Sequence, residues 1–189
     1  MEISKEQIKK IEKFVSQKLT SLIWYHTQAI RPLAKKLAGL EKADKEIVDA
    51  AILFHDIGYV KGGSNDHAQR SAEIARKFLE KEGFEQKFIE EVVYCILVHS
   101  APWENQSNLV KTIEAKVVFD ADMIQQLSEF GIIKHTLLYQ ETILKDFIKG
   151  IIQSRDQFFK AYNLIITQNG RKLAEEGYKY VKNFYKELL

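Results

Sequence analysis

The stretch "AILFHDIGYV", residues 51–60, joins an apolar run to a histidine, an aspartate and then a glycine. The apolar spacing before it predicts a helix through "KEIVDAAILFHDI" that is buried around most of its circumference. His55 and Asp56 therefore lie where the pattern points into a core. Because burying an ionised carboxylate without a partner costs several kcal/mol, we expect a cation to lie beside Asp56.

The rest of the chain also repeats its apolar residues at the helical period. The run at 84–98 would suit a buried strand as well, but its phenylalanines and valines fall at helical intervals. Asp44 is expected to cap the helix at 45–57, and Gly58 to end it in the left-handed conformation. A break is expected near Gly150. Helices are predicted at 3–19, 26–40, 45–57, 67–83, 84–98, 113–127, 132–152 and 171–189.

This pattern predicts an all-α fold, a compact helical bundle in a single domain over residues 1–189. The core is expected at roughly 22–140, with the C-terminal helices of 141–189 packed on it. The composition, 46% apolar and 29% charged, is that of an average soluble globular protein. A length of 189 residues suits one domain better than two.

Charge and targeting signals restrict the partners. With 28 basic and 26 acidic residues, the chain has no large field to attract nucleic acid or an anionic membrane. No apolar run resembles a signal peptide or approaches the ~20 residues that span a bilayer. Cys95, inside an apolar run, is interpreted as an inert core residue. We expect a cytoplasmic protein, monomer or homodimer, that binds neither nucleic acid nor membrane.

Four of the five histidines mark the ends of predicted helices. The two that open a helix are His26 and His67, and the two that close one are His55 and His99; the fifth is His135. A single histidine at a helix end is explained by capping or by the helix dipole. The neighbouring pair of His55 and Asp56 is harder to explain in this way.

A second polar interruption occurs in "AKVVFDADMIQQL", where two aspartates break an apolar helix. Asp120 has Lys116 four residues before it and is expected to form a surface pair. Asp122 points about 200° away around the helix and needs a tertiary partner. Histidine nitrogen and carboxylate oxygen together are ligands for Mn²⁺, Fe, Co²⁺, Ni²⁺, Zn²⁺ or Mg²⁺. A divalent metal ion is therefore the expected cofactor.

Several segments follow His26 in a definite order: "AAILFHDIG", "HAQRSAEIARKFL", "CILVHS", "KVVFDADMIQQLSEFGI" and "GRKLAEEGYKYVKNFYKEL". Together they resemble the HD-domain superfamily of metal-dependent phosphohydrolases, in its branch of small stand-alone bacterial and archaeal proteins. The resemblance extends over roughly residues 22–188. It implies that the metal ligands are His26, His55, Asp56 and Asp122.

The resemblance also implies roles for other side chains. Asp56, His67 and His99 would be catalytic, with the two histidines either binding a second metal ion or contacting phosphate and relaying protons. Phosphate contacts are expected from Lys61, Arg70 and Lys134. Relatives often carry arginine where this chain has Lys134, and lysine loses the bidentate geometry of arginine. The role of His135 and the number of metal ions are left open.

The expected function is hydrolysis of a phosphate ester or phosphoanhydride by metal-activated water. A small phosphorylated molecule is the expected substrate, and a nucleotide is the leading class by resemblance. Three alternatives remain: a non-catalytic HD sensor that binds a metal and a nucleotide, an HD-type di-iron oxygenase, and a structural helical protein whose histidines are caps.

Overall fold

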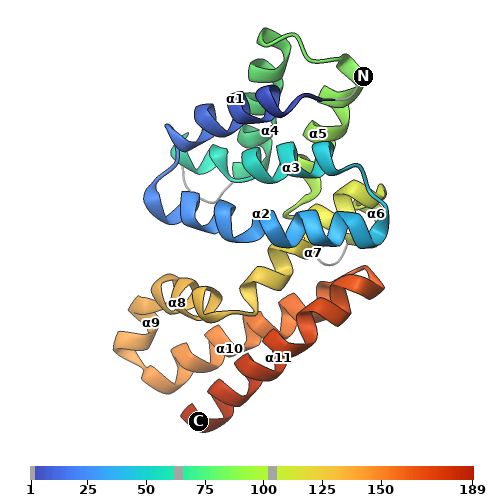
Figure 1. The fold of residues 1–189 in the computed structure, drawn as a ribbon. Coiled ribbons are helices and arrows are strands. Elements are labelled where there is room, and N and C mark those ends of the chain that lie inside the picture. Colours follow the sequence, from blue (N-terminus) through green and yellow to red (C-terminus); the bar gives the residue numbers. More distant parts are fainter. Residues whose placement is uncertain (1–2, 62–65, 102–105) are drawn as a thin grey trace. The chain divides into compact units, whose positions relative to one another are not determined.

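The structure of the protein is a computed structural model that describes residues 3–61, 66–101 and 106–189 (Figure 1). In these ranges the regular structure is helical and no strand forms, which confirms the all-α fold. The chain divides into two compact units, Met1–Phe119 and Asp120–Leu189. A single domain over the whole chain stays a prediction.

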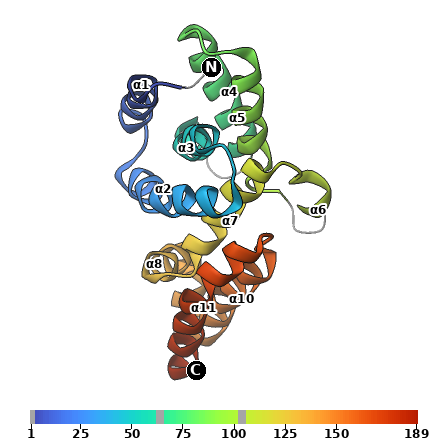
Figure 2. The ribbon, with the colours of Figure 1, turned by 45° about the vertical axis from the view of Figure 1, so that its right-hand side comes forward.

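The first unit is built around α3 (Lys45–Phe54), which packs against the helices on either side of it in the sequence. Figure 2 shows α3 end-on, with α1, α2, α4 and α5 around it. Every residue of α3 from Ile47 to Phe54 is buried, as the sequence predicted. The other elements of this unit are α1 (Lys5–Ser16), α2 (Ser21–Glu41), the 3-10 helix η1 (Ile57–Lys61), α4 (His67–Lys81), α5 (Gln86–Val98) and α6 (Gln106–Leu109). The chain continues in α7 (Ile113–Gln126).

Capping and a buried ion pair fix α3 against α2. The Asp44 side chain accepts hydrogen bonds from the backbone N–H groups of Glu46 (3.0 Å) and Ile47 (3.2 Å), so it caps α3 as predicted. Further along α3, buried Asp49 accepts hydrogen bonds from Arg31 of α2 in a bidentate pair, at 2.5 Å and 3.0 Å. Such a pair has a fixed geometry, and it fixes the position of α2 along α3.

The end of α3 differs from the prediction. Gly58 does not adopt a positive φ, and the chain continues from α3 into η1 instead of stopping. Glycine is needed there for a close approach: a Cβ on Gly58 would lie 2.2 Å from the His67 carbonyl oxygen. The Gly58 N–H donates to Ser71 Oγ at 2.8 Å. Thus η1 packs directly on the first turn of α4.

Two other helix boundaries also correct the prediction. Helix α2 begins at Ser21, five residues before the predicted start, because Thr20 caps it by accepting from the Ile23 N–H at 3.5 Å; His26 therefore lies inside the helix. The single helix expected at 132–152 is divided among α8 (Glu129–Leu138), α9 (Gln140–Lys145) and α10 (Phe147–Leu164). Gly150 lies within α10, where its backbone approaches α9 too closely for a side chain.

In the second unit, α10 packs against α8, α9 and α11 (Gln168–Leu188). The predicted surface pair of Asp120 is wrong, because its side chain is fully buried. Its carboxylate accepts hydrogen bonds from the Ile166 N–H (2.7 Å), the Thr167 N–H (2.8 Å) and the Thr167 hydroxyl (2.7 Å). Asp120 thereby satisfies backbone donors at the start of α11, which a buried turn must pair somewhere.

Candidate metal centre

Five of the predicted site residues come together in the first unit. His26 lies in the second turn of α2, and His55 and Asp56 follow the last turn of α3. His67 begins α4, and His99 ends α5. Four of these side chains are buried, and that of His67 is half-buried. Residues that are up to 73 positions apart in the sequence therefore form one cluster.

The Asp56 carboxylate lies between two pairs of histidines. Its Oδ2 is 3.4 Å from His55 Nε2 and 3.6 Å from His26 Nε2. Its Oδ1 is 3.5 Å from His99 Nε2 and 3.6 Å from His67 Nε2. Each carboxylate oxygen therefore faces one pair.

In two of the histidines, a hydrogen bond to the backbone determines which ring nitrogen carries the proton and which one faces the carboxylate with a lone pair. His55 Nδ1 lies 2.7 Å from the Ile52 carbonyl oxygen, and His99 Nδ1 lies 2.6 Å from the Ile96 carbonyl oxygen. A carbonyl can only accept, so Nδ1 donates in both residues. In the neutral ring Nε2 then keeps its lone pair, as in histidines that bind metals.

The spacing of these nitrogens fits metal coordination. His26 Nε2 and His55 Nε2 are 3.3 Å apart, and His67 Nε2 and His99 Nε2 are 3.2 Å apart. Two nitrogens bound to one ion at about 2.0–2.1 Å lie roughly 3.0–3.4 Å from each other. The residues thus form two groups that could hold a metal ion, His26–His55–Asp56 and Asp56–His67–His99.

The electrostatics of the cluster keep Asp56 ionised. Burial alone would raise its pKa, but when the rings are protonated the charge and hydrogen bond of His55, followed by those of His99, hold the pKa well below its ordinary value. An ionised carboxylate beside four imidazoles attracts a cation. The expectation of a cation beside Asp56, made from the sequence, fits this arrangement.

Tyr59, which the sequence pattern did not indicate, orders one member of the cluster. Its ring stacks on that of His67, with centroids 4.4 Å apart and an angle of 27° between the planes. Tyr59 lies in η1, so the approach of η1 to α4 at Gly58 sets this contact. An aromatic residue three positions after the His-Asp pair was the available signal, but only the fold shows which ring it meets.

Four further predicted residues are not members of these two groups. Arg70 in α4 donates from Nε to the Gly58 carbonyl oxygen at 3.0 Å. Lys61 ends η1, and its side chain lies outside the described part of the chain. Asp122 in α7 and Lys134 in α8 belong to the second unit. The roles expected for these four residues stay predictions.

His135 is a core histidine of the second unit. Its Nε2 lies 3.0 Å from Gln126 Oε1, and its ring meets the edge of Phe158 with centroids 4.9 Å apart. Burial, with a smaller contribution from the neighbouring Lys134, lowers its pKa to about 4. The ring is therefore neutral near pH 7 and donates its Nε2–H to Gln126.

An all-helical fold with a His-Asp doublet at its buried centre defines a class of proteins. The family model described as HD domain matches residues 23–127, more than half of the chain. The protein belongs to the HD-domain family. The matched range contains His26, His55, Asp56, His67, His99 and also Asp122.

Particular relatives cover most of the chain. The uncharacterized protein YpgQ of Bacillus subtilis is 26% identical over 178 residues, which are 87% of this chain and 82% of YpgQ. The crystal structure of YpgQ in complex with ADP is similar with a TM-score of 0.77 and 25% identity, over 97% of this chain and 93% of that one.

A predicted HD superfamily hydrolase from an uncultured Thermotogales bacterium shares the fold, with a TM-score of 0.66 and 23% identity over 95% of this chain and 90% of that one. Among the helices in the described ranges, none has the length and apolar character needed to cross a bilayer.

Proposed function

We propose that this protein is a metal-dependent phosphohydrolase that cleaves a phosphate ester or phosphoanhydride, with a nucleotide as its substrate. The observation that carries this proposal is the position of Asp56, whose two oxygens each face one pair of histidines. A carboxylate between two nitrogen pairs suits two divalent ions about as well as one. Catalysis of phosphoryl transfer to water by paired ions is a common use of such sites.

Two sets of ligands would hold the ions. His26, His55 and Asp56 form the first set, and Asp122 is the further ligand that the sequence predicts for it. Asp56, His67 and His99 form the second. Bound divalent ions lower the pKa of water toward neutrality and neutralise charge on phosphoryl oxygens.

The chain's own residues prepare the centre for this chemistry. The Nδ1–H bonds of His55 and His99 to backbone carbonyls fix the orientation of both rings before any ligand binds. Ionised Asp56 can accept a hydrogen bond from a water molecule and orient it for attack. With a single ion in the first set, His67 and His99 would instead be available to contact phosphate or to donate a proton to the leaving oxygen.

A nucleotide is favoured as substrate by the relative YpgQ, whose crystal structure contains ADP. Lys61, Arg70 and Lys134 are the proposed phosphate contacts. Arg70 already donates one hydrogen bond to Gly58, the second residue after Asp56, so its guanidinium begins from a position near the metal centre.

Phosphate release from a panel of nucleotides and phosphomonoesters, with Mn²⁺, Co²⁺, Ni²⁺, Zn²⁺ or Mg²⁺ added, tests the proposal. We expect Asp56→Ala to lower kcat/KM by roughly 10³-fold, because it removes a ligand common to both sets. Asp156→Ala, on an exposed part of α10, is the matched control and should retain full activity. Release of no phosphate from any substrate by the metal-loaded protein would contradict the proposal and favour a sensor that only binds nucleotide.

The same four histidines favour one second candidate, an HD-type di-iron oxygenase. Its distinguishing property is a requirement for O₂ and iron. Anaerobically purified protein that contains two irons and consumes O₂ with an organic substrate would support this alternative. Phosphate release that continues without O₂ would exclude it as the main activity.

A further inference from the structure

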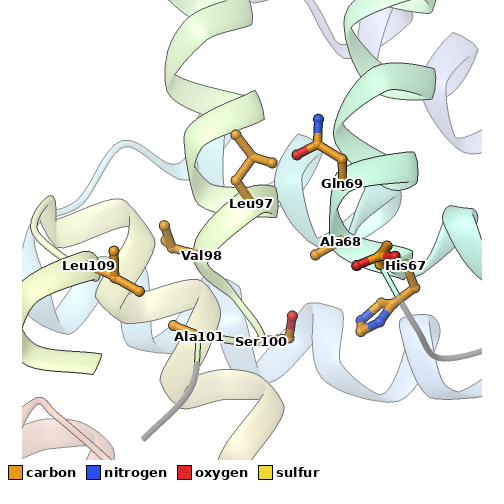
Figure 3. Close-up of a pocket in the computed structure, with 9 residues that line it drawn as sticks. His67, Ala68, Gln69, Leu97, Val98, Ser100, Ala101 and Leu109 are labelled. Carbon is orange, nitrogen blue, oxygen red and sulfur yellow. The ribbon is translucent and has the colours of Figure 1, made fainter. Parts of the chain in front are cut away.

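A cavity of about 580 Å³ lies beside the metal centre, between the start of α4, the end of α5 and α6. Figure 3 shows His67 and Leu109 at opposite ends of this cavity, with Leu97 and Gln69 along one side and Ser100 along the other. Its volume is within the range of about 300–1,000 Å³ that is typical of small-molecule sites. The cavity can therefore hold a group the size of a nucleoside.

His67 connects the cavity to the metal centre. Its ring lines the cavity, while its Nε2 lies 3.6 Å from Asp56 Oδ1 and 3.2 Å from His99 Nε2. Ser100, the residue after His99, lines the cavity as well. Among the described lining residues, His67 is the one that the cavity shares with the Asp56–His67–His99 group, so a ligand that extends from that group past His67 would enter the cavity.

The described walls of the cavity favour an uncharged group over phosphate. Apart from His67, the one described lining residue with an ionisable side chain is Asp66, and its negative charge repels phosphate. Leu97 and Leu109 are 39% and 42% exposed, so a ligand that covered them would remove apolar surface from water. Gln69, Ser100 and Asp66 offer hydrogen-bonding groups among these apolar walls.

We propose that this cavity binds the nucleoside of the substrate while its phosphates lie at the metal centre. The inference rests on the proposed function, and it adds that recognition of the nucleoside, through Leu97 and Leu109, separates nucleotides from inorganic polyphosphates. The Asp66 carboxylate accepts hydrogen bonds from hydroxyl or amino donors of the bound group. The nucleoside in the cavity and the phosphates at the metal centre then make separate contributions to ligand affinity, and each contribution can be measured.

Calorimetric titration of the full chain loaded with Mn²⁺ tests the proposal. The two probes are the methylene analogue of ADP and methylenediphosphonate, which resist hydrolysis and differ by the nucleoside. We expect the ADP analogue to bind at least about tenfold more tightly, because burial of the apolar walls adds roughly the free energy of one tenfold step.

The substitution Leu97→Gln should weaken binding of the ADP analogue about five- to tenfold and leave methylenediphosphonate binding within about twofold. The matched control is Leu40→Gln, the same change at a leucine that is 49% exposed on α2. Leu40 lies 14 residues from His26, or about 20 Å along the helix. This control should bind both probes as the wild type does, and circular dichroism should show all three proteins folded.

Equal affinity for the two probes, or an equal loss of both in Leu97→Gln, would overturn the assignment of the cavity. The proposed function fails differently. A preference for the ADP analogue without any phosphate release from nucleotides would leave the cavity assignment standing and contradict hydrolysis. Phosphate release from nucleotides without a preference for the ADP analogue would support hydrolysis and contradict the cavity assignment.

Discussion

At the scale of single residues, the main feature is that imidazole rings surround the buried Asp56 carboxylate. Four histidine nitrogens lie within 3.6 Å of its oxygens. Neutral imidazoles alone cannot balance the charge, because their facing nitrogens carry lone pairs. Protons or metal ions must supply the positive charge, and the nitrogen spacing of 3.2–3.3 Å suits metal ions.

The metal content of single variants tests the hypothesis that metal ions balance the charge of Asp56. We expect two divalent ions per chain in the wild type and one in His99→Ala, because His99 belongs to the second group alone. Asp56→Ala should hold fewer than one, since its carboxylate is shared. Elemental analysis after dialysis measures the ratio, with Asp156→Ala as the control for unaltered content. Undiminished metal in His99→Ala would show that the second group binds no ion.

His135 illustrates a different use of histidine, as a neutral core residue. Its pKa is about 4 in the folded chain, against an ordinary value of 6.5. The unfolded chain therefore takes up a proton between these values and the folded chain does not. Folding is most favoured above pH 6.5 and loses up to about 3 kcal/mol as the pH falls toward 4.

We expect His135→Gln, which cannot take up this proton, to lessen the acid-induced loss of stability. Urea unfolding at pH 7 and pH 5 measures the free energy of unfolding, and the comparison of the two proteins removes the contributions of other groups. An identical pH dependence in both would mean that His135 is not the group that titrates.

At the scale of elements, the consecutive elements α3, η1 and α4 align the two histidine pairs. The sequence predicted α3, its Asp44 cap and the helical state of 84–98, because local capping and apolar spacing decide these features. It did not predict η1 or the reason for Gly58. The reason for Gly58 is the carbonyl of His67, which lies nine residues further along the chain.

Gly58→Ala tests the close approach of η1 to α4. The added Cβ would meet the His67 carbonyl oxygen at 2.2 Å, so one of the two elements must move. We expect the free energy of unfolding to fall by about 2–3 kcal/mol. We also expect the ion bound by His67 and His99 to be lost. Thermal unfolding and elemental analysis measure the two effects.

The control for this change is Gly39→Ala in α2. A Cβ there would meet the Lys45 side chain at 3.6 Å, an ordinary contact, and alanine favours a helix over glycine. This variant should be as stable as the wild type or slightly more so. If both alanine variants behaved alike, the contact at Gly58 would not be the reason for its glycine.

At the scale of the whole molecule, four helices of the first unit, α2 to α5, contribute residues to one centre. The ends of α3 and α5, the start of α4 and the second turn of α2 each contribute ligands. An ion bound there would link these helices. Because metal binds the folded chain in preference to the unfolded one, it should stabilise the protein.

Removal of metal with EDTA should consequently lower the melting temperature of the wild type by several degrees. A loss of about 1–3 kcal/mol shifts a chain of this size by roughly 2–4 °C for each kcal/mol. Differential scanning calorimetry with and without chelator measures the shift. Asp56→Ala should show none, and an EDTA-insensitive wild type would argue against a resident ion.

The amino-acid sequence by itself determined that this protein is helical, because helicity follows from local apolar spacing, and it predicted a cation beside Asp56 from the cost of burying charge. It also indicated His26, His55, His67 and His99 as a set. Only the tertiary structure decided that the two Asp56 oxygens face separate histidine pairs, that Asp120 pairs with the start of α11, and that a cavity opens beside His67. These features join residues distant along the chain, and apolar periodicity carries no information about which distant groups meet.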